Sequence, residues 1–405
     1  MLKDLVKIFL LFSVFLFSFW GCENDYPESI YNPDETFKPN PAINSVLPDV
    51  AFAGVDTLDI TGTNFSADPS EIEVFFNGEK GEVVSSTTNL VRVIPANIIG
   101  DSIKIQLRVA GALAFAEFDS YKLEPIMIEY GLFDQFDDAQ GLAVDQDENV
   151  YVSLFTSSFG KKLIQKITTD LKRDYFATIL VDKTTQMKMG PDGYIYYVYG
   201  IQYMLRVLPN GGKDEIFAIL PGKAFDLDFD ENLNIYSGGG GNAIYKTTQD
   251  KQTTIVKQYT DTFIRAVRVY DGFLYVAGTY SGGDASHVIE GVWRNQIIEG
   301  ADSLGDTELV LDFGSIFVGK QILSIGISED GNIYLGTNAD EGIYVIKNNG
   351  SFGALYPGVL GPDIYAFTWG NEDFIYVTRK SLINDNKRIL RINMRKRTAP
   401  YYGRI

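Results

Sequence analysis

The segment IGISEDGNIYLG, residues 325–336, contains two short apolar runs separated by an acidic turn with a glycine. In the second run a hydrophobic residue is followed directly by Tyr334. The same arrangement recurs in GLAVDQDENVYV (141–152), MKMGPDGYIYYV (187–198), LDFDENLNIYSG (227–238), VRVYDGFLYVAG (267–278) and FTWGNEDFIYVT (367–378). Each segment predicts a β-hairpin, because Asp, Asn and Gly tolerate the positive φ of tight turns.

The spacing of these hairpins predicts the architecture. Their tyrosines are Tyr151, Tyr196, Tyr236, Tyr275, Tyr334 and Tyr376, which are 45, 40, 39, 59 and 42 residues apart. A period near 40 residues with several strands per unit is typical of a β-propeller. We therefore predict six blades over residues 126–405, with the strand in 126–136 joining the last blade to close the ring. Because the tyrosines share one framework position, we interpret them as packing residues.

The strands that follow each tyrosine carry a family resemblance. YMLRVLPNG (203–211) and GIYVIKNNG (342–350) have an apolar residue, one spacer and a basic residue, followed by a polar turn. This pattern resembles NHL-type blades and the gluconolactonase-like six-bladed propellers. Lactonases of the latter kind hold a divalent metal such as calcium with acidic and amide side chains. Asp226, Asp228, Glu329 and Asn338 lie in suitable predicted loops, but they align to no metal motif.

Residues 41–125 predict a smaller β domain. Leu58, Ile60 and Gly62 alternate with period two, as do Ile103, Ile105, Leu107 and Val109. Pro48, Gly54, LDITGTNF (58–65), VFFNG (74–78) and LVRVIP (90–95) follow one another in an order that resembles an IPT/TIG domain. The resemblance implies an immunoglobulin-like sandwich. The fold class we expect is therefore all-β, an immunoglobulin-like sandwich followed by a six-bladed propeller.

The N-terminus reads as an export signal. Lys3 and Lys7 precede an apolar run from Ile8 to Trp20, which has the length of a signal-peptide core. Gly21 precedes Cys22, so residues 1–21 resemble a bacterial lipoprotein signal, with Phe19 and Trp20 bulkier than usual. The resemblance implies lipidation at Cys22, a flexible acidic tether over 22–40 and, as in Bacteroidetes-type lipoproteins, anchoring to the outer membrane with exposure on the cell surface. The alternative is an ordinary cleaved signal or an N-terminal anchor.

Composition excludes several kinds of chemistry. The net charge of −18 disfavours nucleic acid and anionic lipid as non-specific partners. A single cysteine and a single histidine, His287, allow neither an intrachain disulfide nor a Cys/His zinc site. Residues 379–405 hold nine Lys or Arg against Asp385 alone, which leaves the remainder at −18 − 8 = −26. We interpret this segment as basic strands lying against an acidic body, with a patch for acidic glycans as the alternative.

Candidate ligand residues are those that depart from the repeat. They are Tyr199, Tyr203, Tyr280, Asp284, Trp293, Tyr365 and Trp369, accompanied by Tyr197, His287 and the glycine run 238–241. Exposed aromatic rings beside acidic or amide groups are typical of sugar binding, although core or hairpin packing remains the alternative at each position. No catalytic residue, resident cofactor or metal is predicted.

Three functions compete. The first is a non-enzymatic surface protein that binds glycan as an accessory to polysaccharide uptake. The second is a scaffold for a surface protein partner or for adhesion. The third is a metal-dependent lactonase or hydrolase. A sandwich domain between the tether and the propeller favours the first two functions. A spacer that lifts the propeller away from the membrane helps the capture of a ligand more than it helps catalysis.

Overall fold

The computed structural model describes residues 36–156, 161–380 and 386–404. The predicted signal segment 1–21, Cys22 and most of the tether lie outside the described residues. No helix within the described ranges has the length and apolarity needed to cross a membrane.

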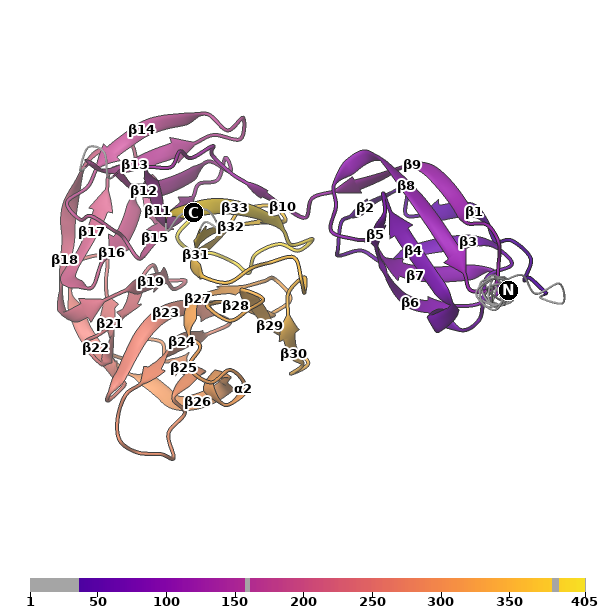
Figure 1. The fold of residues 1–405 in the computed structure, drawn as a ribbon. Coiled ribbons are helices and arrows are strands. Elements are labelled where there is room, and N and C mark those ends of the chain that lie inside the picture. The colour runs from indigo at the N-terminus through magenta and orange to yellow at the C-terminus, as the bar shows by residue number, and fades with distance from the viewer. Residues whose placement is uncertain (1–35, 157–160, 381–385, 405) are drawn as a thin grey trace, which may run out of the picture.

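The first domain is a sandwich of two sheets (Figure 1). Its strands are β1 (Ala42–Leu47), β2 (Val50–Phe52), β3 (Leu58–Thr63), β4 (Ile72–Phe76), β5 (Glu79–Lys80), β6 (Glu82–Ser86), β7 (Leu90–Ile94), β8 (Gly100–Val109) and β9 (Ala116–Glu124), with a 3-10 turn η1 (Pro69–Glu71) before β4. One sheet has the order β1-β3-β7-β6 and the other β2-β9-β8-β4-β5.

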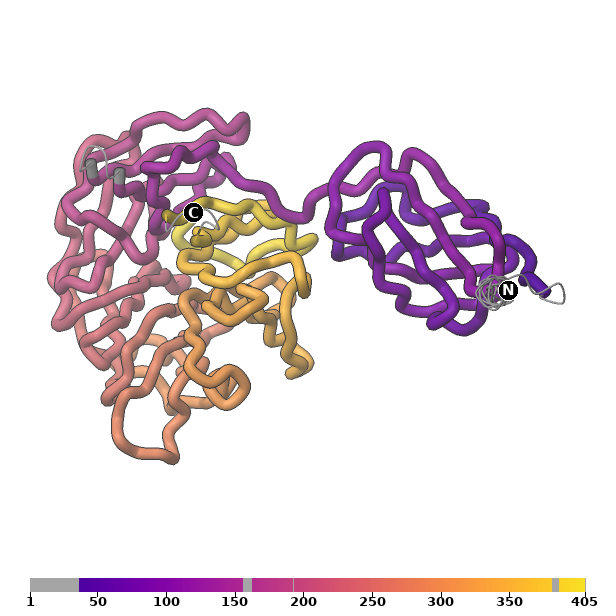
Figure 2. The backbone as a smooth tube through the Cα atoms, in the orientation of Figure 1, coloured from indigo at the N-terminus to yellow at the C-terminus, as the bar shows by residue number. Residues whose placement is uncertain are grey.

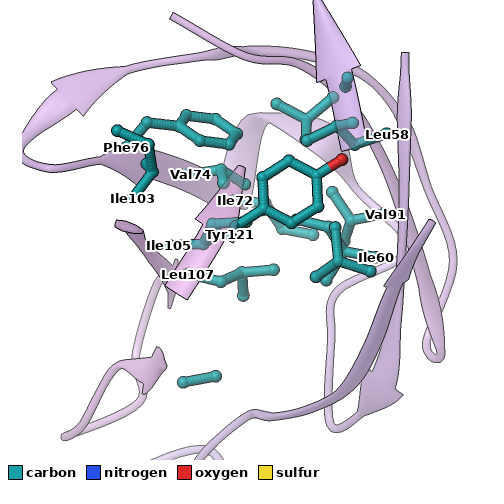
Figure 3. Packing of buried hydrophobic residues seen from close by; sticks show 14 of the residues in the cluster. Leu58, Ile60, Ile72, Val74, Phe76, Val91, Ile103, Ile105, Leu107 and Tyr121 are labelled. Carbon is teal, nitrogen blue, oxygen red and sulfur yellow. The ribbon is translucent and has the colours of Figure 1, made fainter. Parts of the chain in front are cut away.

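The period-two pattern explains how this domain forms its core. Alternate residues of β3, β4 and β8 point inward, so that Leu58, Val74 and Ile105 are fully buried between the sheets (Figure 3). Asn64 takes the positive φ after β3, as its residue type allows. Gly62 serves close approach instead: a Cβ there would overlap the ring of Phe65, which is buried against this strand.

The second domain is a propeller built from six four-stranded units. Blades 1 and 2 comprise β11 (Asp137–Val144), β12 (Val150–Thr156), β13 (Lys161–Ile167), β14 (Arg173–Thr178), then β15 (Gln186–Met189), β16 (Ile195–Val198), β17 (Ile201–Val207) and β18 (Gly212–Ala224), with a 3-10 turn η2 (Pro191–Gly193) after β15. Blades 3 and 4 comprise β19 (Asp226–Phe229), β20 (Ile235–Gly238), β21 (Ala243–Thr247), β22 (Thr253–Gln258), then β23 (Thr262–Tyr270), β24 (Phe273–Tyr280), β25 (Glu290–Ile297) and β26 (Leu304–Asp312). Blades 5 and 6 comprise β27 (Ile322–Ile327), β28 (Ile333–Thr337), β29 (Ile343–Ile346), β30 (Phe352–Ala354), then β31 (Ile364–Trp369), β32 (Phe374–Lys380), β33 (Lys387–Asn393) and β10 (Met127–Glu129), and helix α2 (Phe313–Ile316) precedes β27.

The blades form a ring that closes as the sequence predicts (Figure 1). β10 pairs antiparallel with β33, so the first strand of this domain completes the last blade. One departure from regularity joins blades 1 and 2, because β14 pairs with β18 in parallel through Ala177–Gly212 and Thr178–Lys213. The pairing of β10 with β33 covers an edge of β33 that would otherwise be open to edge-to-edge association.

The six repeated segments are the inner hairpins of the six blades. All six repeated tyrosines are buried, which confirms their interpretation as packing residues. In blade 1, for example, Tyr151 packs edge-on against Phe176 and donates a hydrogen bond to Asp145 at 3.1 Å. Turn carboxylates such as Asp145 therefore serve the fold, since Asp145 also accepts from the backbone amide of Asn149.

The chain passes from the sandwich to the ring once, between β9 and β10 (Figure 2). A second contact links the domains. Arg395, just after β33, forms an ion pair with Asp56 of the sandwich at 2.5 Å, and its guanidinium lies 4.7 Å from the ring centroid of Phe52. The sandwich is therefore held against the rim of the propeller by side-chain contacts as well as by the covalent connection.

Candidate functional site

The innermost strands of all six blades converge on a central channel. The strand ends nearest the β14–β15 and β24–β25 connections border an open pocket of about 280 Å³, which we call the channel mouth. It is lined by Gln140, Lys183, Thr184, Thr185, Gln186, Tyr199, Phe225, Phe263, Arg265, Leu323, Tyr365 and Lys387. Every blade contributes to this wall, as expected where propellers hold ligands.

The opposite end of the channel is closed by the chain's own tail, residues 398–404. Ala399 donates its amide to Ile327 of blade 5 at 3.0 Å, and Tyr401 donates its hydroxyl to Met189 of blade 2 at 2.5 Å. The Arg404 carbonyl accepts from Gln146 of blade 1 at 3.0 Å. Only about 50 Å³ remains beneath the plug. A ligand therefore has access to the channel through the mouth, a choice of face that the sequence did not settle.

Cations form one side of the mouth. Lys387 donates to Gln140 Oε1 at 3.0 Å and lies 3.8 Å from Asp138 Oδ1. Lys183 lies 3.3 Å from the other oxygen of the same carboxylate. Burial lowers the pKa of Lys387, and the neighbouring Asp138 only partly opposes that shift. Two ammonium groups thus share one carboxylate, which lies behind them and outside the pocket wall.

Arg265 is the third cation of the wall, and its charge is matched. Its Nη1 lies 3.2 and 3.3 Å from the two oxygens of Glu290. Its Nη2 donates to Thr279 at 2.5 Å. Burial raises the pKa of Glu290, while Arg265 acts in the opposite direction. This buried pair positions the guanidinium at the wall of the mouth, with its carboxylate partner behind.

Aromatic rings form much of the rest of the wall. The rings of Phe225 and Phe263 lie 4.8 Å apart, tilted by 56°. The Gly238–Gly241 turn permits this packing, because a Cβ on Gly239 would lie 2.8 Å from the Phe225 ring and from the backbone of Ala224. The glycine run thus favours the tight-hairpin interpretation. Its bare backbone makes room for a ring that lines the mouth.

Gln186 supplies a directional polar group in the wall. The side chain is 2% exposed, and its Nε2 donates to the Tyr365 carbonyl at 3.1 Å. That bond turns Oε1 the other way, and within the described residues Oε1 accepts no hydrogen bond. A buried amide oxygen without a donor is costly unless a ligand or water supplies one.

The structure brings two predicted ligand residues into the mouth, Tyr199 and Tyr365. Tyr203 is exposed on β17 but is not part of the wall. Its neighbour Tyr197 is fully buried in the blade core.

The end of β24 and the long insertion that follows it hold two more of the predicted ligand residues, Tyr280 and Asp284, outside the wall of the mouth. The ring of Tyr280 stacks on His287 at 4.5 Å and 15°, and His287 Nδ1 lies 3.0 Å from Asp284. One face of the Tyr280 ring is therefore covered by His287 of this insertion. His287 is an exposed loop residue.

The two predicted tryptophans pack inside blades. Trp369 is 5% exposed and lies edge-on to Tyr334 at 5.3 Å, so its ring presents no face to solvent. Trp293 is half-buried and packs against Tyr259 at 6.3 Å. For Trp369 the prediction of a ligand-stacking ring is thus corrected: hydrophobic burial between blades 5 and 6 takes the residue into the core.

The residues considered for a metal are not assembled into a site. Asp226 is fully buried and paired with Arg268 at 2.9 Å, while Glu329 is exposed in the β27–β28 turn and Asn338 follows β28 at its far end. Within the described ranges, no three His, Cys, Asp or Glu side chains gather as a metal site would require.

The channel interior instead holds a buried charge cluster. Asp226 accepts from Arg268 and from the Val267 amide, both at 2.9 Å. Nearby, Lys188 is 5% exposed, and burial, assisted by Arg268, lowers its pKa to about 8. Such a cluster fixes the inner strands relative to one another.

Sequence reasoning missed most of the mouth. Near the starts of the inner strands, within four residues before the repeated segments, stand Lys183, Gln186, Phe225, Phe263 and Arg265. The position just before each repeat was therefore an available signal. Lys387 does lie in the basic segment singled out above. Other cations of that segment pair with acids, as Lys396 does with Asp330, which agrees with basic strands lying against an acidic body.

Comparisons with known proteins agree with this architecture. The family model of the IPT/TIG domain matches residues 41–123. The search of curated proteins found no match for the chain.

Solved structures share the fold at low sequence identity. A protein of unknown function from Bacteroides thetaiotaomicron is 14% identical, with a TM-score of 0.50 over 90% of this chain and 99% of its own. An auxiliary nutrient binding protein from the same organism is 11% identical, with a TM-score of 0.49 over 89% and 98% of the chains. A luciferin-regenerating enzyme is 14% identical, with a TM-score of 0.52 over 70% and 100%. These similarities concern the fold alone, since function depends on the site.

Proposed function

We propose that this protein is a non-catalytic, lipid-anchored protein of the cell surface that binds a glycan at the channel mouth, as an accessory to polysaccharide uptake. The observation that carries the proposal is the mouth itself. It is a blind pocket, walled by aromatic rings, amides and cations from all six blades and closed below by residues 398–404.

Sugar binding fits this wall chemically. Tyr365, Tyr199 and Phe263 offer ring surfaces that can pack against the C–H face of a sugar. Gln186 Oε1 can accept from a hydroxyl, and Thr184 and Thr185 add hydroxyl groups to the wall. The combination of apolar faces with few directional polar groups is that of a ligand pocket.

The same wall supports binding without turnover. The lining side chains are lysine, arginine, glutamine, threonine, leucine and aromatic residues. Glycoside hydrolysis uses a pair of carboxyl groups facing the substrate, whereas the carboxylates nearest to these cations, Asp138 and Glu290, lie behind them. The competing lactonase function needs a metal site that Asp226, Asp228 and Glu329 do not assemble.

The location rests on the N-terminal pattern. Lysines, an apolar core and Gly21-Cys22 support export and lipidation, and the acidic segment that follows supports surface exposure. Mass spectrometry of the mature N-terminus tests this part: acyl chains on Cys22 are expected, and an unmodified terminus would overturn the anchor.

The binding function is tested with purified residues 23–405 on a polysaccharide array and on affinity gels. We expect retention by at least one glycan, with competition by the free oligosaccharide. No retention on any glycan would overturn the proposal. Lactone hydrolysis that requires calcium would favour the enzyme alternative, and capture of a defined surface protein without glycan would favour the scaffold.

A further inference from the structure

The channel mouth carries more positive charge than its own carboxylates neutralise. Lys183 and Lys387 both face Asp138, at 3.3 Å and 3.8 Å. The remaining cation of the wall, Arg265, has its own partner in Glu290. Among the residues that the structure describes, the three cations of the wall thus pair with two carboxylates, an excess of one positive charge in a chain whose net charge is −18.

The position of the excess charge matters as much as its sign. Asp138 and Glu290 are buried behind the cations and are absent from the wall, so a ligand meets ammonium and guanidinium groups first. The Lys387 side chain is only 16% exposed and the Lys183 side chain 45%. A partly desolvated ammonium binds an anion more strongly than an exposed one does, because less water screens the pair.

Two further contacts fix the orientation of a bound group. Lys387 lies over the ring of Tyr365, 4.7 Å from its centroid, which places a cation and a stacking surface side by side. The unpartnered Oε1 of Gln186 accepts a hydrogen bond and is therefore suited to a hydroxyl rather than an anion. The wall is thus complementary to a ligand that combines one negative group, one hydroxyl and an apolar face.

The closed floor restricts how a polymer can enter. Residues 398–404 lie across the far end of the channel, and a mouth of about 280 Å³ is small for a ligand pocket. A polysaccharide chain therefore enters by its end, with a single terminal unit filling the pocket, and does not thread through the ring.

From these observations we infer that the channel mouth selects an anionic saccharide and binds it end-on, through a terminal unit that carries a carboxylate or sulfate group. Lys183 and Lys387 hold the anion, the Tyr365 ring lies along the sugar and Gln186 Oε1 accepts from a hydroxyl. This inference rests on the proposed glycan-binding function and adds the charge class and the mode of entry.

The test is calorimetric titration of the purified protein with oligosaccharides of one length, ending in a uronic acid, a sulfated sugar or a neutral sugar. We expect the acidic ligands to bind about tenfold tighter than the neutral one at low salt, with the preference shrinking as salt rises. The uronate and sulfate arms identify which anion the mouth takes. A second uronate ligand, with its charge in an internal unit only, tests end-on entry and is expected to bind like the neutral one.

Matched variants assign the effect to residues. Lys183→Gln and the double variant with Lys387→Gln are expected to weaken the binding of the acidic ligands by about tenfold, which abolishes their preference over the neutral ligand. Lys172→Gln, which removes an exposed lysine paired with Asp174 in the β13–β14 turn, is the control and is expected to change nothing. Lys183 is half-exposed, so its variant tests the charge even if the double variant fails to fold.

Failure of this inference is distinguishable from failure of the proposed function. Tighter or equal binding of the neutral ligand, insensitive to Lys183→Gln, would overturn the anionic class while glycan binding stands. Equal binding of the internally charged ligand would overturn end-on entry. Absence of binding to every saccharide would overturn both proposals.

Discussion

Lys387 Nζ lies 4.7 Å from the centroid of the Tyr365 ring, at the point where blade 6 reaches the channel mouth. The two residues belong to different strands, β33 and β31, and each supports the other: the ring shields the ammonium, and the ammonium holds the ring at the wall. Their contact links the electrostatic side of the mouth to its aromatic side.

Replacing Tyr365 with leucine should weaken glycan binding. The variant removes the ring surface and the cation–π contact, each worth about 1 kcal/mol, so we expect the dissociation constant to rise about thirtyfold. Tyr203→Leu is the matched control, since Tyr203 is exposed and lies outside the wall. Titration of both variants with one ligand checks the prediction; equal losses would show that the mouth is not the site.

Replacing Arg268 with methionine should destabilise the propeller. The Asp226 carboxylate would remain buried without its cation, and removal of one partner of a buried ion pair costs about 3–5 kcal/mol. We expect a lower unfolding midpoint in denaturant for Arg268→Met, with partial recovery in the double variant Asp226→Asn, Arg268→Met. A single variant as stable as the wild type would contradict the role of this pair.

Lys188 should make the stability of the propeller depend on alkaline pH. Burial lowers its pKa to about 8, whereas an unfolded lysine titrates near 10.4. Below pH 8 both states carry the proton, and the buried charge opposes folding. Between the two pKa values the unfolded state binds more protons, so the contribution of Lys188 to the free energy of unfolding rises with pH, by about 2–3 kcal/mol in total.

The measurement is the difference in unfolding free energy between the wild type and Lys188→Met at intervals from pH 7 to 10.5. As pH rises, the free energy of unfolding of the wild type should increase relative to that of Lys188→Met. The corresponding difference for Lys172→Met, at an exposed position, should stay flat. A flat curve for Lys188→Met would mean that the lysine titrates normally.

Replacing Arg395 with alanine should loosen the two domains without unfolding either. The contact with Asp56 and Phe52 is partly exposed, so we expect the loss of stability to stay below about 1 kcal/mol. Spin labels on Leu113→Cys and Val318→Cys, both exposed, should report a broader distribution of interdomain distances. Arg92→Ala, which breaks an exposed pair within the sandwich, should leave the distribution unchanged.

The architecture was predictable because it depends on repeated local signals. A tyrosine after an apolar residue and a turn that accepts positive φ recur once per blade, and a single occurrence would have meant little. The outer strands β14, β18, β22, β26 and β30 carry no such signal. The parallel pairing of β14 with β18 is a long-range contact that no local pattern announces.

The site was less predictable, because a blade tyrosine and a ligand tyrosine look alike in sequence. Tyr365 and Tyr199 reach the mouth, whereas Trp369 and Tyr197 turn into the core from neighbouring positions on the same strands or just beyond them. The members of each pair are an even number of residues apart, so the alternation of side chains along a strand does not separate them. Tyr365 lies near the start of β31 and Tyr199 just after the end of β16, and this position along the blade decides which ring reaches the mouth. The excess charge at the mouth required three separate segments to meet around Asp138.

The closure of the ring has a consequence for how the protein is made. Met127 pairs with Ile392, which is 392 − 127 = 265 residues later, and the plug over residues 398–404 comes later still. Contacts this distant form slowly, so the sandwich can fold while the ring is still incomplete. A nascent or truncated chain that ends before β33 would leave the partner edges of β10 and β32 open and the channel without a floor. Such chains would expose these strand edges, which invites edge-to-edge association until blade 6 is complete.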